Sequence, residues 1–455
     1  MRRPTRALIP FWLALAGLAV APRLAAAQGD SLDLPGALAL ARARSPALSG
    51  ANAAVESAEG HLVAARSSRW ARVSADALYL RFQDPPGLAF GGLGALAPIP
   101  ENGYYLQLGV QQPLYTGGRV ANAVRAAQWG TRGSQATRRQ AEVELTAAVA
   151  HAHDAALLAQ ALLGVAEEGS AVLDSAAAQA RTRLSAGTTD RLDVLRAETR
   201  LGSAKADVRR ARGDLAGARE RLAALIGLDP AAVPPVAGEL EPIPVALDSA
   251  AVAGLLAGAR HGRPDLDAFD AAARGAEAAA AAARASLRPT VSLFVNGLVT
   301  RPELVTGRTE WSSNLYGGVV VRWPVFDFGA AAGQSTAARA DAARLRAEAL
   351  QVTNDAVAGV LDQARDLARA VEDVAEGREN VDRAEQALGL AQQRYAEGVG
   401  IQLEVLEAES DLVRTRADLL RATHAQRSAS VELRRLTGQP ADGALLAPAQ
   451  QEGDR

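Results

Sequence analysis

The sequence predicts a mainly α-helical protein that also carries transmembrane β-strands. The chain repeats itself at a distance of 211 residues, each repeat contains a long proline-free stretch of helix-favouring residues, and four segments alternate between apolar and polar side chains. We therefore expect two long helical hairpins and four β-strands in each chain, with the strands contributing to a membrane barrel.

The repeat is clearest in residues 183–198 and 394–409, which read RLSAGTTDRLDVLRAE and RYAEGVGIQLEVLEAE. One supersecondary plan is therefore used twice. The spacing of 211 residues relates nine pairs of identical residues: Arg183/Arg394, Gly187/Gly398, Leu192/Leu403, Val194/Val405, Leu195/Leu406, Ala197/Ala408, Glu198/Glu409, Pro113/Pro324 and Gly118/Gly329.

The duplication predicts an order of parts along the chain. Residues 1–27 resemble a cleaved signal peptide, because three arginines and an apolar stretch precede a run of three alanines; a membrane anchor is the alternative. The remaining parts are a first repeat at 28–229, a proline-rich linker at 230–248, a second repeat at 249–439 and a tail at 440–455.

Composition excludes several kinds of protein. A net charge of −2 gives no electrostatic case for binding nucleic acid. The chain has no cysteine, and of its five histidines only His151 and His153 lie close in sequence, on different faces of a helix. We therefore expect no cofactor, no metal site and no enzymatic activity.

The long helical hairpins are expected at 118–229 and 329–439, each turning at a glycine. The leading arm of the first, 118–186, would extend roughly 100 Å at 1.5 Å per residue. A free-standing coiled-coil hairpin is the alternative. The returning arms carry a heptad seam, namely Val194, Leu201, Val208, Leu215 and Leu222 in the first copy and Val405, Leu412, Leu419, Gln426 and Leu433 in the second.

The strands are expected as two β-hairpins, 71–116 and 290–326, each preceded by a shorter helical segment. Tyr104, Leu106, Leu108 and Val110 alternate with polar or small residues, whereas the segment 71–82 changes phase near Leu78. No mature segment has the ~20 apolar residues of a spanning helix, so we expect the strands to enter the membrane. Four strands cannot close a barrel, which predicts a symmetric homo-oligomer.

With these features the chain resembles the TolC-like outer-membrane efflux proteins of Gram-negative bacteria. The most specific feature is the signature R-x-x-x-G-x-x-x-x-x-x-V-L, which occurs twice in register. The resemblance implies a homotrimer with a 12-stranded barrel in outer-membrane lipid and a helical tunnel in the periplasm. It also implies that the hairpin tips dock onto a periplasmic adaptor, which links the channel to an inner-membrane transporter.

The candidate site residues lie at the two tips. Gly187 and Gly398 let the backbone turn between helices, and the arginine one turn earlier can neutralise helix C-terminal carbonyls or bond to an adaptor. The expected adaptor-docking residues are Arg183, Gly187, Val194, Leu195, Arg394, Gly398, Val405 and Leu406.

A periplasmic gate is expected beside the second tip. Glu404 and Glu407 share a helix face, and by the resemblance they line the narrow entrance as a ring that favours cations. The resemblance also suggests a closed-state hydrogen bond between Asp193 and Tyr395. Gly400 stands where some relatives carry a basic residue, which departs from the family pattern.

The predicted function is an outer-membrane channel-tunnel of a tripartite export system. Substrates would pass from an inner-membrane pump and its adaptor to the exterior. The alternatives are a type I protein secretion channel and a periplasmic adaptor or coiled-coil structural protein. The duplicated amphipathic strand pairs favour a channel over an adaptor.

Overall fold

The computed structural model describes residues 31–81, 83, 101–229, 233–245, 247–301 and 310–441. The expected signal peptide at 1–27 and nearly all of the tail at 440–455 lie outside these residues. The first half contains, in order, α1 (Leu34–Arg44), α2 (Pro46–Ser67), β1 (Arg72–Arg81), β2 (Asn102–Tyr115), α3 (Arg119–Ser185) and α4 (Arg191–Ile226). The second half contains α5 (Ser249–His261), α6 (Pro264–Ala285), β3 (Thr290–Arg301), β4 (Ser312–Arg322), α7 (Ala330–Ala396) and α8 (Gln402–Leu436).

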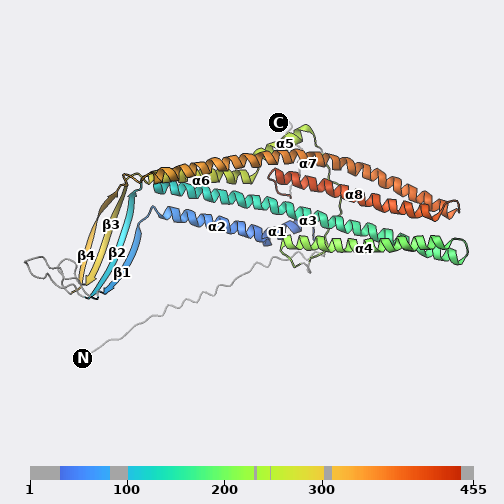
Figure 1. Cartoon of the computed structure of the whole chain (residues 1–455), viewed down its shortest axis with the longest axis horizontal. Helices are drawn as coiled ribbons and strands as arrows, with labels where there is room; N and C mark the ends of the chain where they lie inside the picture. The colour runs from blue at the N-terminus through green and yellow to red at the C-terminus, as the bar shows by residue number, and fades with distance from the viewer. Residues whose placement is uncertain are drawn as a thin grey trace, which may run out of the picture.

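The molecule is elongated, with the sheet at one end and two helical turns at the other (Figure 1). Helices make up 72% of the structure, and the four strands form a single antiparallel sheet. The predicted fold class, mainly α with a four-stranded transmembrane sheet, is confirmed.

Two helices, α3 and α7, run unbroken for 67 residues each. Both begin directly after a glycine with a left-handed backbone, Gly118 and Gly329, at φ of +91°. Asp327 caps α7, because its carboxylate accepts hydrogen bonds from the backbone N–H groups of Gly329 (3.0 Å) and Ala331 (2.7 Å). The chain can therefore pass from strand to helix without an irregular connection.

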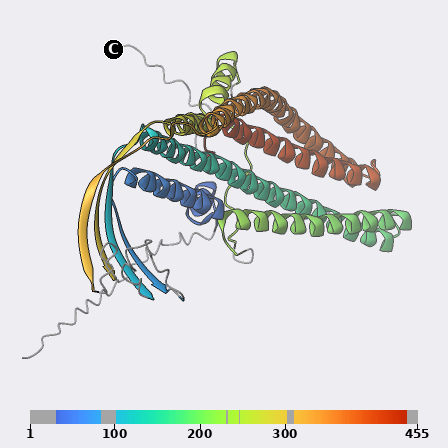
Figure 2. The ribbon, with the colours of Figure 1, turned by 60° about the vertical axis from the view of Figure 1, so that its left-hand side comes forward.

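The shorter helices pack along these two. α2 and α4 lie one after the other along α3, and α6 and α8 follow each other along α3 and α7 (Figures 1 and 2). Glycines permit close approach at the crossings: a Cβ on Gly169 of α3 would lie 2.7 Å from the Val413 side chain of α8. The result is a thin layer of helices that resembles a section of tube wall (Figure 2).

The heptad seam is confirmed in α4, where all five large residues from Val194 to Leu222 are buried. In α8 the seam differs, because that helix packs against both α3 and α7. Its buried face includes a second, polar column at heptad spacing. This column consists of Gln402, Glu409, Thr423 and Ser430, with the half-buried Arg416 at the missing heptad position, and it continues to Thr437 just after the helix.

A buried polar joint holds α3 to α8 near the middle of the molecule. Asp154 of α3 is 2% exposed and accepts two hydrogen bonds from the Arg427 guanidinium of α8, at 2.7 and 3.0 Å. Burial opposes ionisation of Asp154, but the hydrogen bonds from Arg427 and the nearby His153, whose Nδ1 lies 3.8 Å away, outweigh it and lower the pKa of the carboxyl. The Arg427 guanidinium also donates to the carbonyl of Glu241 in the linker, at 3.3 Å.

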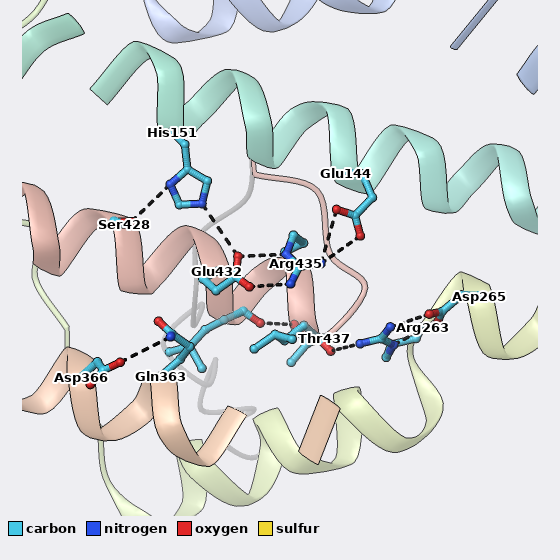
Figure 3. A network of polar contacts seen from close by, with 12 residues as sticks. Glu144, His151, Arg263, Asp265, Gln363, Asp366, Ser428, Glu432, Arg435 and Thr437 are labelled. Carbon is cyan, nitrogen blue, oxygen red and sulfur yellow. Dashed lines mark hydrogen bonds and ion pairs between the residues drawn. The ribbon is translucent and has the colours of Figure 1, made fainter. Parts of the chain in front are cut away.

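The joint continues toward the end of α8. Figure 3 shows Glu144 and His151 of α3 reaching Arg435, Glu432 and Ser428 of α8. The hydrogen bond from Arg435 lowers the pKa of Glu432 to about 2. Because that pKa is depressed, the stabilisation from this ion pair is present above the ordinary value of 4.5 and is lost as pH falls toward 2.

The sheet has one apolar face and one polar face. Strand order is β1-β2-β3-β4, and the register places Val73, Val110, Val295 and Gly317 in one row. Residues two apart along each strand share that face, which carries Ala75, Ala77, Tyr104, Leu106, Leu108, Leu293, Val299, Leu315, Val319 and Val321. The opposite face is the more polar one: it carries Ser74, Asp76, Gln107, Gln111, Asn296 and Asn314, together with Tyr105, Phe294, Leu298, Tyr316 and Val320.

Leu78 lies on the polar face opposite Tyr105, which accounts for the change of phase seen in the segment 71–82. Aromatic side chains mark both ends of the apolar face. The rings of Tyr79 and Tyr104 lie 5.1 Å apart, and Tyr104 lies 5.9 Å from Trp311, at the end far from the helices. At the helical end the exposed residues include Trp70, Tyr115, Trp323, Phe326 and Phe328. Such paired aromatic girdles are typical of barrels in an outer membrane.

The expectation that no mature helix is apolar enough to span a membrane is wrong. α3 contains an 18-residue window with a mean hydropathy of 1.4, of which 22% is buried in the chain. By length and composition alone this window qualifies. Its apolar side chains include Leu145, Val149 and Leu157, which pack against α1 and α4. Part of the apolar content of α3 thus serves packing between helices.

Substitutions on neighbouring residues of β2 test the two faces of the sheet. An arginine on a lipid-facing strand position costs about 2–4 kcal/mol near the membrane midplane. Leu108→Arg is therefore expected to reduce heat-dissociable trimer in the outer-membrane fraction severely. Gln107→Arg, opposite Asp76 on the polar face, is expected to leave it near the wild-type amount. Equal losses for the two variants would contradict the assignment of faces.

The polar column of α8 gives a second prediction. Glu409 is 5% exposed, its Oε2 atom has no hydrogen-bond partner, and burial raises the pKa of its carboxyl despite the nearby Arg416. A raised folded-state pKa means that the charged carboxylate destabilises the fold above that pKa and that acidification relieves the effect. Glu409→Gln is thus expected to raise the temperature of trimer dissociation at neutral pH. This increase in dissociation temperature should become smaller as pH falls toward 4.5, the ordinary pKa of a glutamate carboxyl.

The matched control is Asp411→Asn on the exposed side of the same helix, which should change both quantities little because its ion pair with Arg414 is exposed. A Glu409→Gln variant that is less stable than the wild type at neutral pH would show that the carboxylate has a stabilising partner.

Candidate functional site

The two tips are closed by glycines with left-handed backbones. Gly187 has φ of +72° and Gly398 has φ of +79°. Beyond each glycine the backbone folds back onto the arginine of the signature: Thr188 N–H donates to the Arg183 carbonyl at 2.9 Å, and Val399 N–H donates to the Arg394 carbonyl at 3.0 Å. These bonds satisfy carbonyls that the end of a helix leaves unpaired.

The glycines of the tips differ in their surroundings. A Cβ at Gly187 or Gly398 would meet no atom within 4 Å, so both turns present open backbone. A Cβ at Gly400 would lie 3.0 Å from the backbone nitrogen of Tyr395. Any side chain at position 400 would therefore require a small shift of this backbone.

The paired residues of the signature do not occupy equivalent environments. Val194 and Leu406 are buried in the helix seams. Leu195 is 50% exposed, and Val405 is half-buried. The register of the buried face therefore shifts by one residue between the two tips.

Both tips expose apolar side chains to solvent. We use the name tip patch for Leu184, Leu192, Leu195, Val399 and Ile401, which are 37% to 70% exposed. Four of these residues were not predicted as site residues, although Leu192 belongs to the repeated pattern. Val399 and Ile401 have no counterpart in the first copy, and their position directly after the tip glycine is the sequence signal that could have identified them.

One contact joins the two tips. The Arg183 guanidinium lies over the ring of Tyr395, with its carbon 4.2 Å from the ring centroid. Asp193 instead accepts a hydrogen bond from the hydroxyl of Thr189 at 2.9 Å and lies 3.8 Å from Arg196. In the part of the chain that the structure describes, no hydrogen bond links Asp193 to Tyr395. A cation–π contact thus stands where sequence reasoning expected a hydrogen bond.

The two carboxylates of the second tip differ in exposure. Glu404 is half-buried and Glu407 is exposed, and neither makes an ion pair or a hydrogen bond through its side chain among the described residues. Two turns farther along α8, Arg416 bonds to Glu168 of α3 (3.1 Å) and Glu385 of α7 (2.8 Å). Arg416 therefore connects the two hairpins behind the tips.

Comparison with known proteins places this architecture in a family. The family model described as outer membrane efflux protein matches residues 37–228 and 255–439, which together cover most of the chain. Among solved structures, the outer membrane protein VceC from Vibrio cholerae has a TM-score of 0.74 at 21% identity, covering 90% of this chain and 97% of that one.

Two curated relatives match more locally. The fusaric acid resistance protein FusA of Burkholderia cepacia is 29% identical over 311 residues, which is 67% of this chain and 57% of the relative. Protein CyaE of Bordetella pertussis (strain Tohama I) is 28% identical over 316 residues, which is 69% of this chain and 65% of the relative. The chain thus spans less than two thirds of either relative. Because the family model matches both halves, the chain belongs to the outer membrane efflux protein family.

Proposed function

We propose that this protein is the outer-membrane channel-tunnel of a tripartite export system. The family places the chain in the outer membrane, with its helices in the periplasm. The observation that carries the proposal is the sheet with one apolar and one polar face, continuous with a layer of long helices. An adaptor or a coiled-coil structural protein needs no such sheet.

The number of strands requires an assembly of several copies, and the family indicates that the assembly is a trimer. The outer edges of β1 and β4 have no partner strand within the described chain. Each unpaired backbone group costs several kcal/mol in a bilayer, and barrels begin at about eight strands. Three copies would give the 12-stranded barrel of the family.

The tips are the proposed docking site for a periplasmic adaptor. The tip patch provides apolar area, and the open backbone at Gly187 and Gly398 allows another chain to approach closely. Through the adaptor the channel would connect to an inner-membrane transporter. The name of one relative refers to fusaric acid resistance, which favours efflux of small molecules over type I protein secretion, the alternative.

The gate is proposed at the second tip. Glu404 and Glu407 lie on one face of α8, and three copies would form rings of carboxylates around the entrance. Such rings attract cations and repel anions. Arg183 and Tyr395 would hold the two hairpins of one chain together when the entrance is closed.

Charges in the tip patch test the docking site. Leu195→Asp combined with Val399→Asp leaves the buried seams intact but introduces desolvated charge into any apolar contact. Retention of the adaptor on the immobilised trimer is expected to fall at least tenfold, while the trimer still reaches the outer membrane. The control, Gly213→Asp, adds a charge at an exposed position far from the tip on α4 and should retain the adaptor. Unchanged retention in the double variant would overturn docking through this patch.

Neutral substitutions test the gate. Glu404→Gln combined with Glu407→Gln is expected to reduce cation preference and to change single-channel conductance in planar bilayers, because the rings lose their charge. Glu198→Gln, the control, removes a carboxylate that is already paired with Arg181 at the first tip. If cation preference and conductance matched those of the wild type, the carboxylate gate would be wrong.

A further inference from the structure

Arginines gather where the helices meet the sheet. The whole chain has a net charge of −2, yet the first turns of α3, from Arg119 to Arg139, contain five arginines and no carboxylate. Arg66 and Arg69 lie just before β1, Arg284 and Arg288 just before β3, and Arg322 at the end of β4. At the far end of this run Arg139 pairs with Asp267 at 2.8 Å and Arg138 lies 3.9 Å from Glu142.

Some of these arginines line a cleft between α3, α6 and α7. The cleft has a volume of about 520 Å³ and a floor of alanines. We name it the arginine cleft. Its lining includes Asn122 of α3, Glu277, Arg284 and Arg288 from α6 and the turn after it, and Arg339 and Arg346 of α7.

The arginines of the cleft have different bonding partners, depending on their distance from the sheet. Arg346, farthest from the sheet on α7, forms an ion pair with Glu277 at 2.6 Å. Arg288, nearest the sheet, donates one hydrogen bond to the carbonyl of Gly117 at 3.2 Å. Arg284 and Arg339 form neither an ion pair nor a hydrogen bond through their side chains within the described residues. Three positive charges thus share one cleft with no carboxylate bonded to any of them.

The unneutralised arginines lie at the level of the membrane surface. Arg288 is two residues before β3, and the indole N–H of Trp323 donates to the neighbouring Leu287 carbonyl at 3.1 Å. Trp323 belongs to the aromatic girdle, which marks the edge of the hydrocarbon region. The headgroup layer extends roughly 6 Å beyond that edge. Arg284 lies one helical turn from Arg288, also about 6 Å, and the long arginine side chain of Arg339 can extend toward the same layer.

The cleft opens on the outer side of the wall. α5 packs on one side of the helix layer. A transport passage through the tunnel requires the other side to stay clear. The side that carries α5 is therefore the outside of the tunnel. On α7, Val357 packs against the cluster that contains Leu255 and Ala259 of α5. Arg339 precedes Val357 by 18 residues, about five full helical turns, and therefore lies on the same face. The arginine cleft consequently faces lipid, and the lumen lies behind it.

We propose that the arginine cleft binds the phosphate diester of a phospholipid headgroup from the periplasmic leaflet of the outer membrane. Guanidinium groups bind phosphate oxygens with paired, charge-assisted hydrogen bonds. Acyl chains can then run along the exposed girdle residues Phe326 and Phe328 toward the apolar face of the sheet. The bound lipid anchors the trimer at a fixed depth. This proposal rests on the proposed function, because it requires the sheet to lie in the outer membrane.

The test compares lipid retention on the purified trimer by native mass spectrometry. The probes are a phosphatidylglycerol, a diacylglycerol with the same acyl chains, and inorganic phosphate alone. The variant is Arg284→Gln with Arg339→Gln; Arg288 is kept because it also bonds to Gly117. The control is Arg365→Gln with Arg383→Gln, which removes two exposed and paired arginines from the half of α7 that is nearer the tip.

We expect phosphatidylglycerol retention to fall at least tenfold in the variant and to remain unchanged in the control, with little diacylglycerol retained by any protein. Retention in the variant equal to that of the wild type would overturn the proposal. Displacement of the lipid by millimolar inorganic phosphate would identify a free-anion site and overturn the lipid as ligand. The heat-dissociable trimer in the outer-membrane fraction is measured separately, so that failure of membrane insertion is distinguished from failure of lipid binding.

Discussion

An open sheet edge cannot remain in a membrane, because each exposed backbone N–H or C=O group loses its water without gaining a partner. The outer edges of β1 and β4 impose this requirement along 10 and 11 residues. Closure of the barrel by further copies removes both edges at once. Since α3 and α7 leave β2 and β4 within a few residues, through Gly118 and Gly329, the symmetry of the barrel is transmitted directly to the helices. The tunnel therefore follows from the hydrogen bonds of the sheet.

The sequence carries the architecture because its signals are local. The absence of proline permits α3 and α7, alternation predicts the faces of β2 and β3, and the heptads predict the buried side of α4. The sequence pattern predicts the buried face less well where one helix packs against two others. α8 lies against both α3 and α7, so its buried face exceeds one seam and includes the polar Gln402 and Glu409. Likewise, the seam predicts burial of Val194 but not the exposure of its neighbour Leu195.

The tips show why a repeated motif does not specify a repeated site. Arg183 and Arg394 are equivalent in sequence, and both backbones close the same turn. Of the two, Arg183 lies over an aromatic ring, that of Tyr395 in the other copy. The first copy has Leu184 at the position equivalent to Tyr395 and so offers no ring to Arg394. This contact depends on the packing of one hairpin beside the other, which no pattern within either hairpin encodes. The difference between the copies thus creates the contact between them.

The strength of the contacts between the hairpins decreases from the middle of the molecule to the tips. Removing one partner from a buried ion pair such as Asp154–Arg427 typically costs about 3–5 kcal/mol. The Arg416 ion pairs are exposed, and such pairs contribute about 0–1 kcal/mol. An exposed cation–π contact like that of Arg183 with Tyr395 contributes about 0.5–1 kcal/mol. Parting the tips therefore breaks only weak contacts, whereas parting the hairpins at the joint exposes a buried charge. Any movement of the entrance should accordingly pivot about the joint between α3 and α8.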